Sequence, residues 1–444
     1  MLHEASSVLI VAVVGMTSVV RAAGSTVQLV NDTGCDCFLT NGSEPTYYAR
    51  HMFFDFRSLG RYAGVPDVIG NDTLASYSPP TSDFFAGDRW NDTWQIQGWS
   101  NRNGSHGEGK GGLTGDATVL MVNSPSNVYI EKNGDDGAGR SAATFMTLRT
   151  KRLPGFQTAA EFQAQDTHYR FLSLRMLART VGDPGAVSAV FTYRAAQSLS
   201  DVQEADIEIL TRGPRNKVQY TNQPSYQDDQ TGGGDHHGDD GNGDDPKATR
   251  NATMPHGLRW SDWAVHRLDW TPRRSVWFVD GVEVASIDFQ VPRDASGLNV
   301  NSWSDGGQWS GNMSVGGESK LQIQWLEMVF NTTEDGDGDG ARRRRSASKR
   351  QGEHEQHHHH HHYPHSYSQQ RRDAAAAAAA PEDNGGGGGG CKIVCSIDET
   401  SRTGTAAKLW DGSTSGAKPS SSAGSTLFWL CACAAASTMW LSAV

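Results

Sequence analysis

Strand-like alternation is the feature that most limits what this chain can fold into. Large side chains alternate between two faces in Tyr169–Ala178, in Trp263–Trp270 and again in Leu321–Val329. Ser275–Ile287 forms two alternating arms around an Asp-Gly dipeptide, which is typical of a tight hairpin. No helical period of about 3.6 residues is sustained alongside these runs. Many strands joined by Gly-rich turns predict an all-β fold, either a sandwich or a jelly roll.

The N-terminus carries an apolar run followed by small residues. Val8–Val20 contains 13 uncharged residues, and Arg21-Ala22-Ala23-Gly24 comes next. A run of this length is too short to span a bilayer comfortably and is typical of a secretory signal peptide. We therefore predict that residues 1–23 are a signal peptide and that the protein is extracellular. The alternative is a buried N-terminal strand.

A second apolar segment, Leu427–Val444, ends the sequence. The polar spacer Lys418–Thr426 and the small trio Ser415-Gly416-Ala417 precede it. This order is the pattern that directs attachment of a GPI lipid. We predict lipidation at Ser415, removal of residues 418–444, and anchoring to the plasma membrane at the cell surface or cell wall. The alternative is a tail-anchored transmembrane helix.

Sequons for asparagine glycosylation agree with a secretory route. They occur at Asn31, Asn41, Asn71, Asn91, Asn103, Asn251, Asn312 and Asn331. Because all of them precede residue 334, we expect residues 24–333 to form a folded domain that carries glycans.

Cysteine usage fits an oxidising compartment. Cys431 and Cys433 would leave with the C-terminal tail. The cysteines that remain are Cys35, Cys37, Cys391 and Cys395. Four cysteines allow three pairings, and a bond between alternate residues of one extended strand would be strained. We therefore expect the N-terminal pair to bond to the C-terminal pair, which would fasten the Cys-containing segment and stalk, residues 391–417, to the domain.

Residues 334–390 have a composition that cannot bury a core. They include runs of arginine, histidine, alanine and glycine, such as His357–His362 and Gly385–Gly390. We predict a disordered linker here. The acidic insert at residues 228–245 lacks the ligand order of a calcium loop. We predict no calcium site in this insert, no metal site elsewhere and no cofactor for the protein. For the histidine run, the alternative to a solvated tract is a metal-binding segment.

Three acidic residues alternate with apolar ones in the segment Glu204–Ile209. Side chains of a strand alternate, so Glu204, Asp206 and Glu208 share one face while the apolar set packs into the core. The two glutamates lie about 13 Å apart at Cα. Side chains that lean together reach the ~5–5.5 Å separation used in double displacement at a glycosidic bond. Three acids this close cannot all ionise cheaply, so at least one pKa should rise. The alternative is an acidic, solvated strand face.

The pentapeptide Glu204–Glu208 resembles the E-x-D-x-E signature of glycoside hydrolase family 16. The likeness runs from about Gln157 to Asn331, and together with the anchor signal it resembles the GPI-anchored fungal type of this family. The resemblance implies a concanavalin A-like β-jelly roll sandwich with a concave sugar-binding cleft. It also implies that Glu204 is the nucleophile, that Asp206 holds and tunes it, and that Glu208 is the acid/base.

Further motifs carry the same resemblance. They are the segment around Glu161, the aromatic strand before the signature, the strand after it, and an N-x-W motif followed by glycines. The residues implied in substrate binding are Glu161, Phe191, Tyr193, Tyr220, Asn222, Asn301, Trp303 and Trp309.

The activity that the resemblance implies is endo-acting hydrolysis of β-glucan with β-1,3 or mixed β-1,3-1,4 linkages. The expected partners are a polysaccharide substrate and, through the lipid, a membrane. We expect a monomer and no nucleic-acid partner. Two alternatives remain: a cell-wall transglycosylase of the same fold, and a lectin-like glucan binder without turnover.

Overall fold

The computed structural model describes residues 28–102, 112–134, 142–196, 198–225, 246–333 and 391–412. Several predicted features lie outside these ranges. They are the signal peptide, the sequon at Asn103, the acidic insert, the linker, the lipidation site Ser415 and the C-terminal tail.

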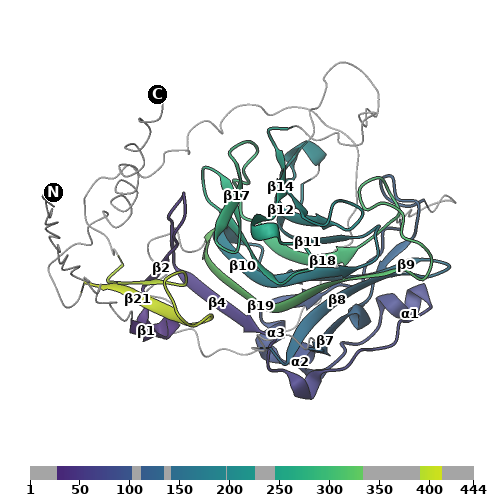
Figure 1. Ribbon diagram of the computed structural model, residues 1–444, viewed down its shortest axis with the longest axis horizontal. Coiled ribbons are helices and arrows are strands. Elements are labelled where there is room, and N and C mark those ends of the chain that lie inside the picture. The colour runs from purple at the N-terminus through teal and green to yellow at the C-terminus, as the bar shows by residue number, and fades with distance from the viewer. Residues whose placement is uncertain are drawn as a thin grey trace, which may run out of the picture.

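Two curved layers of strands make up one continuous 16-stranded sheet (Figure 1). The first layer contains, in spatial order, β14 (Thr249–Thr253), β13 (Lys217–Gln223), β12 (Gln203–Leu210), β11 (Val187–Arg194), β18 (Gly297–Trp303), β9 (Gln157–Ala164) and β5 (Trp94–Ile96). The second contains β7 (Val128–Lys132), β8 (Thr144–Arg152), β19 (Glu318–Thr332), β10 (Tyr169–Gly182), β15 (Ala264–Trp270), β16 (Ser275–Val279) and β17 (Val282–Ile287). Pairing of β8 with β9 joins the layers, β4 (Arg50–Asp55) pairs with β19, and β6 (Met121–Asn123) runs parallel to β9.

The hydrophobic core fills the space between the layers. Trp270 and Trp277 of the second layer are fully buried, as is Tyr220 of the first. The rings of Tyr220 and Trp277 lie 5.5 Å apart between centroids, so they join the layers directly. This arrangement confirms the prediction of an all-β jelly-roll sandwich.

The predicted hairpin is β16 and β17. Its central residues, Asp280 and Gly281, have φ angles of 47° and 77°. Positive φ at both positions is what a two-residue type I′ turn requires, and Asp-Gly is a preferred pair for it. The other alternating runs of the sequence lie in β10, β15 and β19, as predicted.

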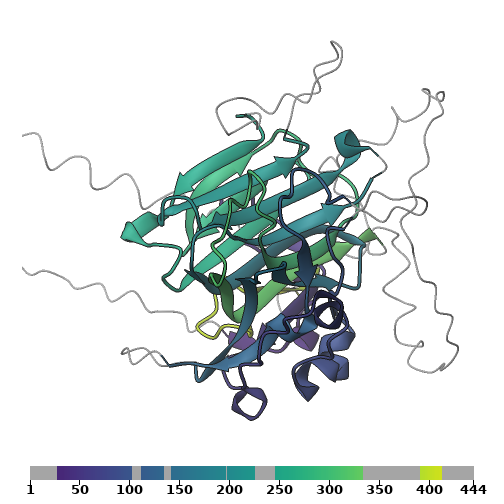
Figure 2. The same ribbon diagram turned by 90° about the vertical axis from the view of Figure 1, so that its right-hand side faces the viewer.

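Short helices cluster at one side of the sandwich, within the purple N-terminal part of the chain (Figure 2). They are α1 (Asp72–Ser76), α2 (Asp83–Ala86) and α3 (Asp88–Asn91), and the single 3-10 turns are η1 (Asp32–Gly34), η2 (Gly60–Tyr62), η3 (Pro125–Asn127), η4 (Leu199–Asp201) and η5 (Pro255–Gly257). The rings of Trp90 and Trp94 lie 5.2 and 5.1 Å from that of Phe162 on β9. This packing fixes the N-terminal segment against the first layer.

A separate five-stranded sheet joins the two ends of the described chain. It contains β1 (Gln28–Val30), β21 (Ala406–Asp411), β20 (Ile393–Ser396), β2 (Cys37–Leu39) and β3 (Tyr47–Tyr48). Disulfides link Cys35 to Cys395 and Cys37 to Cys391. The expected pairing of the N-terminal cysteines with the C-terminal ones is therefore confirmed. The described part of the segment predicted as a stalk, residues 391–412, lies within this sheet.

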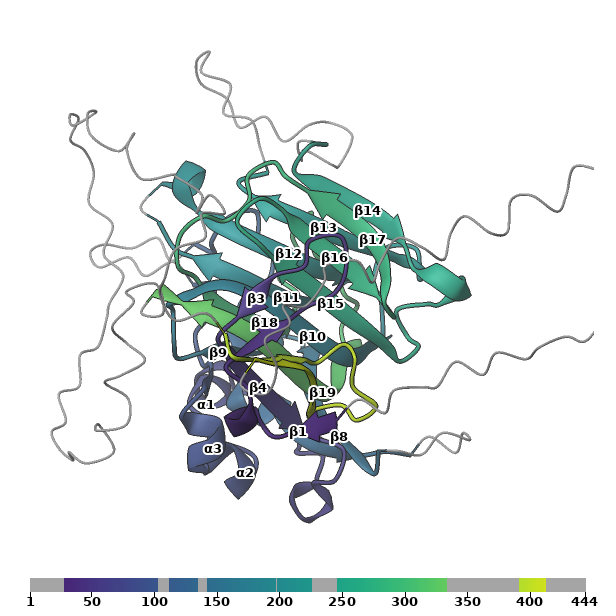
Figure 3. The same cartoon turned by 90° about the vertical axis from the view of Figure 1, so that its left-hand side faces the viewer.

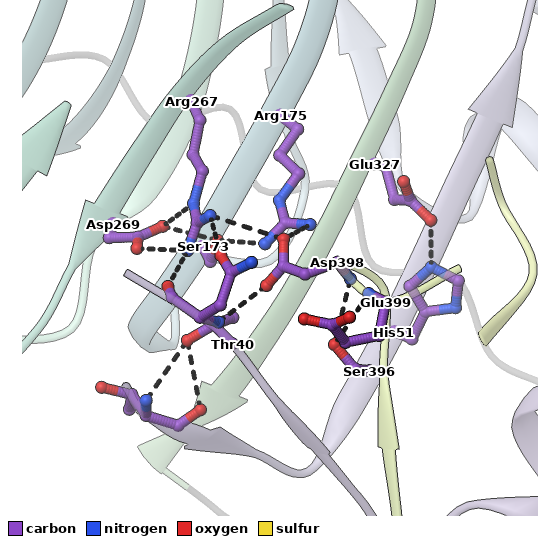
Figure 4. A network of polar contacts seen from close by, with 12 residues as sticks. Thr40, His51, Ser173, Arg175, Arg267, Asp269, Glu327, Ser396, Asp398 and Glu399 are labelled. Carbon is purple, nitrogen blue, oxygen red and sulfur yellow. Dashed lines mark hydrogen bonds and ion pairs between the residues drawn. The ribbon is translucent and has the colours of Figure 1, made fainter. Parts of the chain in front are cut away.

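A buried ion network fastens the C-terminal segment to the second layer (Figure 4). Arg175 of β10 lies 2.5 Å from Asp398, measured from Nη1 to Oδ1. Arg267 of β15 forms two hydrogen bonds with Asp269, of 2.7 and 2.6 Å, and also lies 3.4 Å from Asp398. The side chains of all four residues are at most 7% exposed. The backbone amide of Asn41 donates to Asp398, so the N-terminal segment takes part as well.

His51 of β4 connects the same three parts of the molecule. Its Nδ1 lies 2.8 Å from Asp32 and its Nε2 lies 3.0 Å from Glu327 of β19. Burial lowers the pKa of His51, but the hydrogen bonds to Asp32 and Glu327 outweigh burial and raise the pKa to about 9. The amide of Gly404 donates to the same Glu327 oxygen. His51 is therefore positively charged at neutral pH and lies between two carboxylates.

The sequons for glycosylation fall mostly on the surface. Asn31, Asn41, Asn71, Asn91, Asn251 and Asn312 are exposed. Asn331 is half-buried and its Nδ2 donates to the carbonyl of Tyr47, so a glycan there would displace this bond. Glycosylation itself stays a prediction. Within the described ranges, no helix has the length and apolar character needed to cross a membrane.

Removal of the charge on Asp398 should destabilise the whole molecule. In Asp398→Asn, two buried guanidinium groups face the single carboxylate of Asp269, and we expect the free energy of unfolding to fall by about 3 kcal/mol. The control is Asp72→Asn, whose partner Arg102 is exposed, and we expect it to cost less than about 1 kcal/mol. Urea unfolding of the oxidised protein measures both. Equal, small losses would show that the network does not hold the segment in place.

Candidate active site

The three acids of the E-x-D-x-E segment lie on one face of β12. Ala205, Ile207 and Ile209 point into the core between the layers. Asp206 on the opposite face is 3% exposed, and Glu204 and Glu208 are half-buried. The predicted alternation is therefore confirmed, and the acids line the side of the first layer that faces away from the core.

Strand register places more of the predicted residues on this face, because residues directly opposite each other on paired strands point the same way. Tyr193 of β11 pairs with Glu204, and Phe191 pairs with Asp206 (β11 and β12 are adjacent in Figure 3). The two rings lie edge to face with 6.3 Å between centroids, and Tyr193 is 39% exposed. The Glu204 end of the triad therefore has aromatic surface beside it.

A second row of paired residues crosses four strands. Glu208 of β12 pairs with Ala189 of β11, Ala189 pairs with Asn301 of β18, and Asn301 pairs with Glu161 of β9. Asn301 Nδ2 also donates to Glu161 Oε2 at 3.4 Å. Glu161 is 7% exposed, and burial raises its pKa while its hydrogen bonds act in the opposite direction. Asn301 and Glu161 therefore add polar side chains to the acidic face.

Of the two predicted tryptophans of the N-x-W region, Trp309 contacts Glu208 directly. Trp309 donates from Nε1 to Glu208 Oε1 at 3.0 Å. Trp303 is half-buried and lies on the same face as Asn301, two residues further along β18. This N–H bond to a carboxylate oxygen restricts the orientation of Glu208.

The loop that carries Trp309 is fixed by its backbone. The amides of Thr118 and Val119 both donate to the carbonyl of Asp305. Gly306 has a φ of 72°, and a Cβ there would lie 2.3 Å from Thr118 Oγ1. Only glycine fits both the conformation and the contact, so the sequence at this turn determines where Trp309 is placed.

Two predicted substrate-binding residues are not part of this face. Tyr220 and Asn222 of β13 pair with Ile207 and Ala205, which belong to the core face. Tyr220 is 1% exposed, and Asn222 is fully buried with its Nδ2 bound to the carbonyl of Phe289. The prediction that they line the cleft is therefore wrong. Alternation along β13 places both side chains on the core face.

The residues of β13 that do share the acidic face are their neighbours in sequence. Gln219 pairs with Glu208, Thr221 with Asp206 and Gln223 with Glu204. Alternation within Val218–Gln223 would have identified them, since Tyr220 is the residue that fits a core position. Trp99 was also missed: its Nε1 donates to Glu161 Oε1 at 3.1 Å. The resemblance begins at about Gln157, so it gave no indication of Trp99.

The pKa of Glu204 is shifted by its surroundings. Burial raises the pKa of Glu204 to about 7, while its hydrogen bond with Asp206 acts to lower it. The pKa of one acid of the triad therefore rises as expected, but the cause is burial of Glu204 and not repulsion by its acidic neighbours. Two carboxyl groups in a hydrogen bond share one proton, so Glu204 and Asp206 titrate as a coupled pair.

Open space lies next to the triad at the strand ends. A cavity of about 550 Å³ is lined mainly by polar side chains, among them Arg194, Gln203, Gln223, Arg293 and Asp294. Gln203 immediately precedes Glu204, and Gln223 pairs with it. Among the described residues, no group of three or more His, Cys, Asp or Glu side chains is arranged to hold a metal ion.

Taken together, these groups can perform acid/base and nucleophilic chemistry on a sugar. One carboxylate can attack while the other, held by an indole N–H, exchanges a proton. Exposed aromatic and amide groups along the same face suit the apolar faces and hydroxyl groups of a saccharide.

Comparison with protein families gives one match. Residues 124–327 match the family described as Glycosyl hydrolases family 16. This segment contains all of β12 and every predicted catalytic residue. No curated protein matches the chain.

Solved structures with a similar fold include a prokaryotic β-1,3-1,4-glucanase (lichenase) derived from a mouse hindgut metagenome. Its identity is 18% and its TM-score 0.36, over 63% of this chain and 98% of that one. The catalytic domain of an endo-1,3-β-glucanase (laminarinase) from Thermotoga petrophila has 14% identity and a TM-score of 0.37, over 55% and 92%. An endo-β-1,3-glucanase from Pyrococcus furiosus has 14% identity and a TM-score of 0.39, over 67% and 99%.

Loss of the Asp206 carboxyl should raise the pKa of Glu204 further. In Asp206→Ala the hydrogen bond that lowers this pKa is gone, so we expect a value clearly above about 7. Asp206→Asn keeps an N–H donor beside Glu204, and we expect a smaller rise. Carbon-13 NMR titration of labelled glutamate carboxyl groups measures both variants. An identical pKa in Asp206→Ala and the unchanged protein would contradict the coupling.

Proposed function

We propose that this protein is a retaining endo-β-glucanase of family 16 that cleaves β-1,3 or mixed β-1,3-1,4 linkages. The observation that carries the proposal is the placement of Glu204, Asp206 and Glu208 on one outward face of β12, within the segment that matches the family. A protein that only binds sugar has no need of a carboxyl group such as Glu204 beside two further acids, since burial makes its ionisation costly.

The proposed reaction has two displacements at the anomeric carbon. In the first, ionised Glu204 attacks this carbon and forms a glycosyl ester, while Glu208 gives its proton to the departing glycosidic oxygen. In the second, Glu208 takes a proton from water, and the resulting oxygen nucleophile displaces Glu204. The anomeric configuration is inverted twice and so retained. The hydrogen bond between Asp206 and Glu204 lowers the pKa of Glu204 and so favours its ionised form before attack.

The choice of β-glucan rests on the family match and on the resemblance of the signature, which both point to this class of polysaccharide. The row formed by Glu208, Asn301 and Glu161 extends across the strands, as a cleft for an extended chain must. Such a cleft binds a polymer along its length and favours internal cleavage. A transglycosylase would use the same first step and then transfer the sugar to a second glycan instead of water.

Glutamine variants test the catalytic assignment. Glu204→Gln and Glu208→Gln should each lower the cleavage rate by about a thousandfold or more, because each removes a group that reacts. The substrates are laminarin, lichenan and chitin oligomers. The control is Glu283→Gln, an exposed residue of β17 in the other layer, which should keep full activity. Azide should restore cleavage by Glu204→Ala with inverted product.

Product sizes separate the candidate functions. Shortened β-glucan oligomers identify a hydrolase, and products longer than the substrate identify a transglycosylase. Binding without any product identifies a lectin-like protein and ends the proposal. Near-normal rates in both glutamine variants would show that the catalytic residues lie elsewhere.

We further propose that the protein is secreted, glycosylated and held at the cell surface by a GPI lipid. The support is the pair of apolar terminal segments, the sequons and the two disulfides. A phospholipase specific for GPI should release the protein from intact cells into the medium. Retention on the membrane after this treatment would favour a transmembrane tail instead.

A further inference from the structure

Trp99 is the most exposed of the described tryptophans, with 46% of its surface accessible. It follows β5 in a segment that precedes the family match at residues 124–327. A single exposed aromatic residue is ordinary on a protein surface. Trp99 differs from that case because both its backbone and its side chain are held in place.

The backbone at Trp99 is fixed on three sides. The amide of Asn123 donates to the Trp99 carbonyl at 2.9 Å, and the amide two residues before Trp99 donates to the carbonyl of Glu161 at 2.9 Å. A Cβ on Gly98 would lie 2.3 Å from the carbonyl oxygen of Ser76, so no other residue fits there. The Ser76 hydroxyl also donates to the Gly98 carbonyl.

The ring of Trp99 is fixed by the acidic face itself. Its Nε1 donates to Glu161 Oε1 at 3.1 Å, and Asn301 holds the other oxygen of the same carboxylate. Glu161 is 7% exposed, so this anchor is buried while the indole remains accessible. An aromatic plate that is both accessible and already oriented loses little conformational entropy when a ligand stacks on it.

Strand register gives the distance from Glu161, which holds this ring, to Glu208. Glu161 and Glu208 belong to the same row and are separated by three strand spacings, or about 14 Å. A β-linked glucosyl unit is about as long as one strand spacing. A chain that lies along the row therefore extends about three units from Glu208 before it reaches Trp99.

We propose that Trp99 is the stacking platform of a distal glucan subsite, about three sugar units from the bond that is cleaved. This inference rests on the proposed function. The apolar face of a glucosyl ring stacks on the indole, and Glu161 sets the orientation of the indole. The consequence is a dependence on chain length: oligomers long enough to reach Trp99 gain binding that shorter ones lack.

The test compares oligomers of increasing length. In Trp99→Ala, kcat/KM for hexamers and longer β-glucan oligomers should fall about tenfold, while kcat/KM for trimers should change less than about twofold. Trp99→Phe keeps an aromatic ring but loses the bond to Glu161, and we expect an intermediate loss. Tyr47→Ala is the control, since Tyr47 is 51% exposed on β3 of the small sheet. Thermal unfolding of each variant checks its fold.

Binding measurements separate failure of this inference from failure of the proposed function. In a Glu204→Gln background, calorimetry should show that Trp99→Ala weakens binding of hexamers about tenfold. No loss of hexamer binding would overturn the inference, and so would equal losses of kcat/KM for trimers and hexamers. If the unchanged protein cleaves no β-glucan, the proposed function fails, and the binding comparison still decides whether Trp99 is a sugar platform.

Discussion

The constraint on which the site depends is the two-residue period of β12. Ala205, Ile207 and Ile209 must face the core, because the layers of the sandwich are held together by burial of such side chains. Because side chains alternate along a strand, the three acids between them must lie on the opposite face. A shift of one residue would bury three carboxylates and expose the apolar set, which no fold could tolerate. Packing therefore fixes the three acids on one face of β12.

Neighbouring strands extend the same constraint across the acidic face. Each strand of the first layer places alternate residues on the acidic face, so Tyr193, Asn301 and Glu161 arrive there through pairing alone. Trp309 and Trp99 come instead from loops. Their indole N–H groups bond to Glu208 and Glu161, respectively. Rigid strands thus supply the acids, and loops supply the groups that orient them.

Structural features that follow from the alternation of side chains could be predicted from the sequence. Features that depend on contacts between residues far apart in the sequence could not. The sandwich, the β16–β17 hairpin and the shared face of the triad follow from periods and turn residues, and all are confirmed. Cysteine geometry also predicted that the N-terminal pair meets the C-terminal pair. By contrast, nothing in the sequence shows that Asp398 enters a buried network with Arg175 and Arg267, which lie more than a hundred residues away. The prediction for Tyr220 and Asn222 is wrong. Their distance from the signature resembles the family, but alternation along β13 turns both side chains to the core.

The central claim is that Glu204 forms a covalent bond to sugar during turnover. A β-glucan oligosaccharide with fluorine at C2 and a dinitrophenyl leaving group slows the second displacement more than the first, so the ester accumulates. Mass spectrometry of the intact protein and then of its peptides measures where the sugar is attached. We expect one added glycosyl group per chain, on the peptide that contains Glu204. Attachment to another residue, or no attachment while the compound is still hydrolysed, would contradict it.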